Sequence, residues 1–157
     1  GLVESQNIIQ YYEIARNLAE IRENHNDTLS PQVAKLMAYG ATISDEAYQE
    51  AIDGRSGAVS YFASFFSDFD AIITPAAPGE APLFSVGSTG NPIFSTIWTL
   101  CGLPCLNMPV LMSENDMPIG VQLVGGREED DRLLRMGSWL LETLNAVEAD
   151  IAESAET

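Results

Sequence analysis

The sequence predicts an α/β protein in which a small mixed β-sheet is flanked by helices. Three observations predict this class. Apolar residues recur at helical spacing over residues 1–67, short apolar runs bounded by turn residues follow, and an amphipathic segment closes the chain. Two of the short runs are separated by about five turn residues, which predicts a hairpin and hence one antiparallel pair of strands.

The first part of the chain predicts three helices. Residues 4–24 form an amphipathic pattern, and a polar break follows it. A second helix is expected over 30–40, because Ser30 is a good N-cap and Pro31 suits the first helical position. A third is expected over 44–66, again with a serine at its start.

The middle of the chain predicts strands around one long loop. The apolar run 70–75 ends at a proline, which is typical of a buried strand. A loop rich in Pro, Gly and Ser covers 76–90, and loops of this length usually have a function or are disordered. A short helix is expected over 92–101, followed by the hairpin strands 105–111 and 119–124.

Four acidic residues at 128–131 predict the start of the closing helix, because carboxylates in a first turn complement the helix dipole. We expect a single domain over residues 1–157. Within it we expect a helical part (1–67), a core of strands and helices (68–147) and a frayed acidic tail (148–157).

The charge of the chain excludes some partners. Twenty-three acidic and seven basic residues give a net charge of −16, so nucleic acids and anionic membranes are not expected to bind. Residues 81–113 carry no charge at all, but their prolines and glycines would interrupt any membrane-spanning helix. We therefore expect this uncharged run to be buried in protein or to face a substrate.

Metal and redox chemistry are not expected. Cys101 and Cys105 are best explained as two core thiols, and a metal site would need further ligands although the chain has one histidine. No cofactor motif is present. Nothing at the N-terminus resembles a signal peptide, so we expect a cytoplasmic protein.

A nucleophile with its activating base is also missing from the sequence. His25 lies in the polar break after the first helix, and Lys35 is on a short surface helix without an S-x-x-K motif. The run 85–90 is rich in Ser and Gly, which favours a flexible loop over an anion site. We therefore predict no catalytic residue and no metal ligand in this chain.

Two aromatic residues, Phe94 and Trp98, are four positions apart and share one face of the short helix. They could pack in the core, or they could form the wall of a pocket for an apolar or aromatic substrate group. The sequence leaves both possibilities open.

Four motifs in order resemble the C-terminal part of the amidase signature family. They are the segments 69–78 (FDAIITPAAP), 88–92 (STGNP), 98–104 (WTLCGLP) and 117–125 (MPIGVQLVG). The resemblance covers roughly residues 60–142, and the preceding helices are compatible with it. Each motif alone is weak, whereas the ordered set is fairly specific.

The resemblance implies the C-terminal part of the family's α/β/α fold, without its catalytic centre. Family members hydrolyse or transfer amides through an acyl-enzyme, using a Ser nucleophile, a second Ser in a cis peptide, and a Lys, all N-terminal to the motifs matched here. This chain would then supply scaffold and one wall of the substrate funnel, with Asn91, Phe94 and Trp98 as the substrate-binding candidates. Its partners would be the N-terminal remainder of an amidase and a small-molecule amide. The chain alone is expected to be inactive.

Alternatives remain. The chain could belong to the A-type component of a glutamyl-tRNA amidotransferase, but such proteins tend to place an Asp near Pro92, and the sequence Asn91-Pro92 departs from that pattern. It could also be a non-catalytic binding module derived from an amidase. A third alternative is an interaction domain that forms a homo-oligomer.

Overall fold

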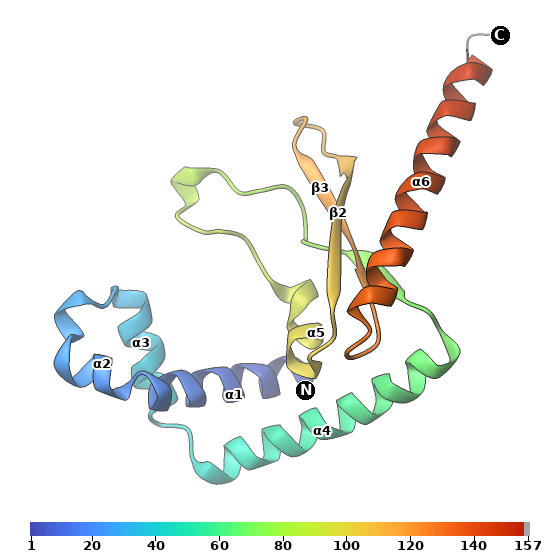
Figure 1. The fold of residues 1–157 in the computed structure, drawn as a ribbon. Coiled ribbons are helices and arrows are strands. Elements are labelled where there is room, and N and C mark those ends of the chain that lie inside the picture. Colours follow the sequence, from blue (N-terminus) through green and yellow to red (C-terminus); the bar gives the residue numbers. More distant parts are fainter. Residues whose placement is uncertain (156–157) are drawn as a thin grey trace. The chain divides into compact units, whose positions relative to one another are not determined.

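The computed structural model describes residues 1–155, with side chains described through residue 147. The chain divides into two compact units, 1–61 and 62–157, and the boundary falls inside one long helix (Figure 1). The single domain expected from the sequence stays a prediction. The predicted acidic tail lies outside the residues whose side chains are described.

The first unit is helical, as predicted. Its elements are α1 (Leu2–Asn17), α2 (Ala19–Asn24), the 3-10 turn η1 (Asn26–Thr28), α3 (Pro31–Gly40) and the first part of α4 (Asp45–Asp68). The single helix predicted over 4–24 is interrupted at Leu18, where φ is −104° and ψ is 17°. Both serine caps are confirmed: the Ser30 hydroxyl accepts from the Val33 N–H at 3.3 Å, and that of Ser44 accepts from the Ala47 N–H at 3.2 Å.

Helices α1 and α3 cross at a glycine. A Cβ atom at Gly40 would lie 1.9 Å from the carbonyl oxygen of Tyr11, so only glycine permits this approach. Ala15 and Met37 are buried beside it. The closeness of the two helix backbones therefore depends on one missing side chain.

The second unit contains a three-stranded sheet. The strands are β1 (Ile72–Pro75), β2 (Cys105–Met112) and β3 (Pro118–Val124), in the order β1-β3-β2. Both pairs are antiparallel, with Ile72 and Cys105 opposite Val124. A register shift lies between Met108 and Leu111, at Pro109, which has no N–H to donate.

The α/β class is confirmed, but the sheet is not mixed among the described strands. The two outer strands, β1 and β2, run in the same direction, because both are antiparallel to β3. They would form a parallel pair if they were neighbours. Instead β3 lies between them, and this arrangement depends on contacts far apart in sequence.

The connection from β1 to β2 matches the predicted loop and helix. It contains the 3-10 turns η2 (Phe84–Val86) and η3 (Ile93–Ser95) and the helix α5 (Thr96–Cys101). Gly102 ends α5 with a φ of 66°, a left-handed conformation that favours glycine. In Figure 1 the connection leaves the sheet, extends away from it and returns to α5.

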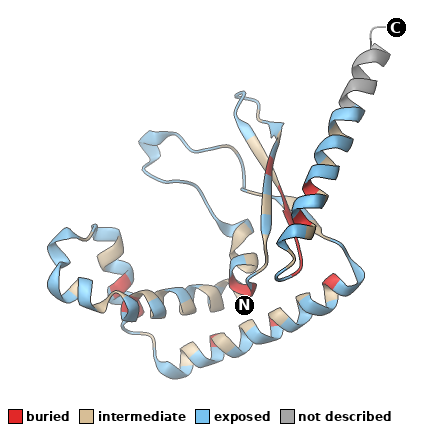
Figure 2. Cartoon of the chain, viewed as in Figure 1, coloured by how far each residue is buried: buried red, intermediate tan, exposed pale blue. Residues whose placement is uncertain are grey.

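Helix α6 (Asp130–Ala155) covers one face of the sheet. Leu133 of α6 forms the core with Met108 and Leu123, and several side chains pack around them (Ala71, Leu106, Val110 and Leu140). Figure 2 shows these buried residues on β2, β3 and the start of α6. The helix begins two residues later than predicted, because Glu128 adopts a left-handed φ of 63° in the preceding turn.

The first part of the uncharged run is not buried in this chain, and the alternative that it faces a substrate stays a prediction. All residues from 81 to 94 are exposed in this chain, and Phe84 is fully so. The run is a loop that makes few contacts with the sheet, so its apolar side chains stay uncovered. In the part of the chain that the structure describes, no helix is long and apolar enough to span a membrane.

Candidate functional site

A hollow of about 600 Å³ lies where the long connection meets the sheet. One wall is the segment 76–82, which follows β1, and the other is the segment 89–92, which precedes η3. Asn107 of β2 and Gly120 of β3 also line it, together with Pro118. The lining is uncharged except for Glu80.

The hollow and the core lie on opposite faces of the sheet. Residues directly opposite one another on neighbouring strands project to the same face. Gln122 is opposite Thr74 on one side and Asn107 on the other, so these three polar residues form a row across the sheet. Leu123 is opposite Ile73 and Leu106, and it faces α6.

Asn107 reaches the hollow because Gly120 has no side chain. A Cβ atom at Gly120 would lie 2.1 Å from the Asn107 Oδ1. The Gly120 carbonyl accepts from the Ala76 N–H at 2.9 Å and continues the ladder one residue past β1. This pair therefore shapes the base of the hollow.

Gln122 connects both walls. It is only 3% exposed, and its Nε2 donates to the Pro75 carbonyl at 3.1 Å and to the Phe94 carbonyl at 3.0 Å. Pro75 ends β1 and Phe94 lies in η3, so one amide group holds two segments that are distant in sequence.

Glu80 attaches the first wall to the tip of the β2–β3 hairpin. Its Oε1 accepts from the Asn115 Nδ2 at 2.7 Å, and its Oε2 accepts from the Ser113 hydroxyl. These hydrogen bonds favour the charged carboxylate and lower the pKa of Glu80 below its ordinary value of 4.5. The acidic group of the hollow is thus ionised and engaged in hydrogen bonds.

The three predicted substrate-binding residues fall in different surroundings. Asn91 lines the hollow, and its Oδ1 accepts from the Ile93 N–H at 3.1 Å, which shapes the start of η3. Phe94 is exposed and contributes its carbonyl to Gln122. Trp98 packs edge to face against Phe62 with ring centres 5.5 Å apart. A substrate-binding role for all three stays a prediction.

The indole Nε1 of Trp98 is buried and has no hydrogen-bond partner among the described residues. The contact with Phe62 favours the core-packing alternative for this side chain. Asn91 lines the hollow, and Phe94 lies two residues after the lining segment 89–92.

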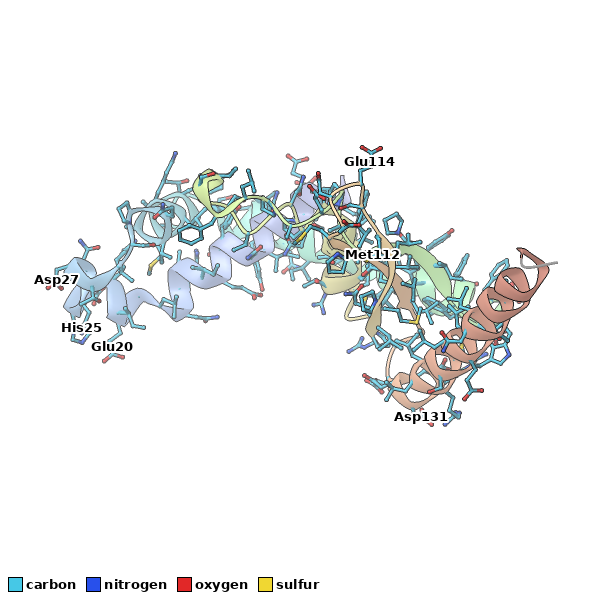
Figure 3. All side chains as sticks on the ribbon, turned by 90° about the horizontal axis from the view of Figure 1, so that it is seen from above. Glu20, His25, Asp27, Met112, Glu114 and Asp131 are labelled. Carbon is cyan, nitrogen blue, oxygen red and sulfur yellow. The ribbon has the colours of Figure 1, made fainter. Side chains whose placement is uncertain are left out.

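His25 and Lys35, excluded as catalytic candidates, are not among the residues that line the hollow. Figure 3 shows His25 with Glu20 and Asp27 around the turn that follows α2, and His25 is exposed. Lys35 is exposed on α3. No group of three or more candidate metal ligands was found among the described residues.

One of the two cysteines differs from expectation. No disulfide joins them, and Cys101 is fully buried as predicted. Cys105, the first residue of β2, is exposed.

Four residues that shape the hollow were not predicted from the sequence: Gln122, Asn107, Gly120 and Glu80. Signals for them existed. Gln122 is the one strongly polar residue in the apolar strand 119–124, and a glycine inside a strand often marks a close approach. Glu80 is the last charged residue before the uncharged run. None of these signals shows which distant groups the side chains meet.

A family model described as Amidase matches residues 4–134. Among curated relatives, the A-type component of the glutamyl-tRNA(Gln) amidotransferase of Pseudothermotoga lettingae is 31% identical over 124 residues, covering 71% of this chain and 26% of that protein. The corresponding protein of Orientia tsutsugamushi (strain Ikeda) is 28% identical over 149 residues, covering 90% of this chain and 29% of that protein.

Solved structures show the same likeness. A crystal structure of an amidase superposes with a TM-score of 0.82 at 26% identity, covering 91% of this chain and 35% of that chain. The A-type component of the Thermotoga maritima glutamyl-tRNA(Gln) amidotransferase superposes with a TM-score of 0.59 at 20% identity, covering 86% of this chain and 31% of that chain, and it supports the fold alone. The chain spans roughly a quarter to a third of the length of the proteins it matches.

Proposed function

This chain belongs to the amidase family, and from that membership we propose that it is the C-terminal part of an enzyme that hydrolyses carboxylic amides. In this proposal the chain supplies scaffold and one wall of the substrate site. The hollow between the segments 76–82 and 89–92, with Asn107 of β2 and Gly120 of β3 at its base, is the observation that carries the assignment of that wall. The catalytic residues come from the N-terminal remainder of the protein.

The lining of the hollow supports a small, uncharged amide as the substrate. Alanine, proline and glycine make up most of its lining residues, and Asn91 and Asn107 contribute side-chain amides. An amide group both donates and accepts hydrogen bonds, so such side chains are suitable partners for it. Ser113 and Asn115 hold the Glu80 carboxylate at the hairpin tip, and it keeps its negative charge there.

In the proposed reaction, a Ser oxygen of the N-terminal part attacks the amide carbonyl carbon. The C–N bond breaks as a relay of a cis-Ser and a Lys delivers a proton to the departing amine nitrogen. Water then attacks the acyl carbon and gives a proton to the relay, the bond to the Ser oxygen breaks, and the relay delivers that proton to the Ser oxygen. The described residues that line the hollow include no Ser, Cys, Lys or His, which supports a catalytic centre outside this chain.

Exposed apolar surface supports the role as part of a larger protein. A second hollow of about 510 Å³ lies between β1 and α6, with Ile73 and Trp139 each more than 60% exposed. Its charged members, Asp70 and Arg132, pair with each other. Exposed apolar patches of this kind often mark surfaces that another polypeptide covers.

The test compares the 157-residue chain with the full-length gene product that contains it. Both are assayed on a panel of aryl and aliphatic amides, with ammonia or amine release as the readout. We expect turnover by the longer protein and none above background by the chain alone. Turnover by the isolated chain would overturn the assignment of chemistry to the N-terminal part.

The A-type component of a glutamyl-tRNA(Gln) amidotransferase is the second candidate, because both curated relatives described above have that name. The same preparations are therefore tested for amide transfer to glutamyl-tRNA(Gln), alone and with the other amidotransferase components added. Transfer in the reconstituted mixture, without hydrolysis of the simple amides, would favour this candidate over a general amidase.

A further inference from the structure

We propose that Gln122 is a positioning residue, whose single side-chain amide sets the separation between the two walls of the hollow. This inference rests on the proposed function in one respect: that the hollow is the place where an amide substrate binds. The structural part of the inference concerns this chain alone and is tested separately.

The two hydrogen bonds of Gln122 lie at the base of the two walls. The Pro75 carbonyl immediately precedes the wall 76–82, and the Phe94 carbonyl lies two residues after the wall 89–92. The acceptors are 47 and 28 positions from Gln122 in the sequence. A shift of this side chain would therefore move both walls relative to the sheet.

The chemistry of the site requires an amide at this position. The Nε2 group has two hydrogens, and both are used, one for each carbonyl. A neutral group suits a residue that is 3% exposed, because a buried cationic donor would need a counter-charge. Since both partners are carbonyls, they also fix which end of the side chain is the nitrogen.

The other attachments of the walls are few. The Ala76 N–H bonds the Gly120 carbonyl at 2.9 Å, and Glu80 bonds the hairpin tip. The side chains of Ser88 and Asn91 accept from the Gly90 and Ile93 N–H groups, each two positions away. Among these attachments of the described residues, Gln122 alone bonds both sides of the hollow.

The first experiment measures amide hydrogen exchange by NMR in the 157-residue chain. Gln122→Leu removes both donors, and Gln49→Leu on α4 is the matched control, since Gln49 bonds only Asp53 on the same helix. We follow the Ala76, Ile93 and Ser95 amides at the base of the walls. In Gln122→Leu we expect about tenfold faster exchange at these amides and less than about twofold change within the β2–β3 pair. The control should leave all of them unchanged.

A second variant keeps the test decisive if Gln122→Leu fails to fold. Gln122→Glu has nearly the same shape, and its protonated carboxyl can donate one hydrogen bond whereas the carboxylate donates none. Protection of the wall amides in this variant, corrected for intrinsic rates, should therefore fall as pH rises and the carboxyl ionises. Unchanged wall exchange in a folded Gln122→Leu, or pH-independent protection in Gln122→Glu, would overturn the proposal.

The last arm measures amide hydrolysis by the full-length gene product. Because the walls of the hollow are proposed to bind the substrate, Gln122→Leu should raise KM about tenfold and leave kcat within about twofold. Gln49→Leu is the control. Absence of any hydrolysis by the unmodified protein would refute the proposed function, and the exchange experiment would still decide the structural role of Gln122. An unchanged KM in an active enzyme would refute the link between Gln122 and substrate binding.

Discussion

Gly120 and Asn107 show how one side chain depends on the absence of another. The Asn107 amide occupies the space that a Cβ atom at position 120 would fill. The residue at the base of the hollow is thus held by a glycine on the neighbouring strand.

Gly120→Ala should therefore displace the Asn107 side chain and lower the free energy of unfolding by about 1–3 kcal/mol, as is typical of overpacking. Urea unfolding of the 157-residue chain measures the change. The double variant Gly120→Ala/Asn107→Ala removes the clash and should recover most of the loss. Equal losses in the single and double variants would contradict this explanation.

The Glu80 carboxylate predicts a dependence on pH. Its pKa is lowered because Ser113 and Asn115 donate to it, so the folded state binds the proton less readily than the unfolded chain. The stabilisation is present above the ordinary pKa of 4.5 and is lost as pH falls through the lowered folded value. An NMR titration of the Glu80 carboxyl should give a midpoint below 4.5.

The variant Ser113→Ala/Asn115→Ala provides the control for that titration. Without either donor, the pKa of Glu80 should return toward the ordinary value. A midpoint that is the same with and without the two donors would show that these hydrogen bonds do not hold the carboxylate.

At the residue scale, the sequence predicted positions better than contacts. Asn91 was predicted for the substrate wall, and it does line the hollow. Trp98 was placed on the same helix face as Phe94 by helical spacing, but spacing cannot show that Phe62 from another helix contacts the ring. Gln122 was missed because both of its partners are backbone groups more than 25 positions away.

At the scale of elements, local signals were the reliable ones. The serine caps at Ser30 and Ser44 and the stop at Gly102 all depend on a few neighbouring residues, and the structure confirms them. The strand order was not predictable in this way. The position of β3 between β1 and β2 depends on pairing across more than forty residues.

The crossing of α1 and α3 gives a prediction at the same scale. Gly40→Ala places a Cβ 1.9 Å from the Tyr11 carbonyl oxygen, and backbone cannot move aside as a side chain can. We expect thermal unfolding to show a loss of about 2–3 kcal/mol or more, with α1 and α3 separated.

Gly57→Ala is the matched control for that substitution. Gly57 is also helical, but nothing lies within 4 Å of its Cβ position. Alanine there should stabilise helix α4 by roughly 0.5–1 kcal/mol. If both alanines changed stability by the same amount and sign, close helix contact would not be the reason for Gly40.

At the scale of the whole molecule, the resemblance to amidases was recoverable from four ordered motifs, and the family match confirms it. Of the two alternatives predicted for the uncharged run, burial does not hold for residues 81–94 in this chain, and contact with a substrate stays a prediction. Absence of charge indicates a surface that avoids water, but it does not identify what covers that surface. For a chain that spans about a third of a related structure, the cover is expected from outside it.

The order β1-β3-β2 has a consequence for synthesis on the ribosome. The strand that pairs with both neighbours is the last to be made, because β1 ends at Pro75 and β3 begins only at Pro118. At about 5–20 residues per second, β1 waits several seconds for its partner. During that interval the nascent chain presents an unpaired strand followed by the apolar segment 81–94. A chain whose translation stops before Pro118 contains both outer strands and lacks the one with which each of them pairs.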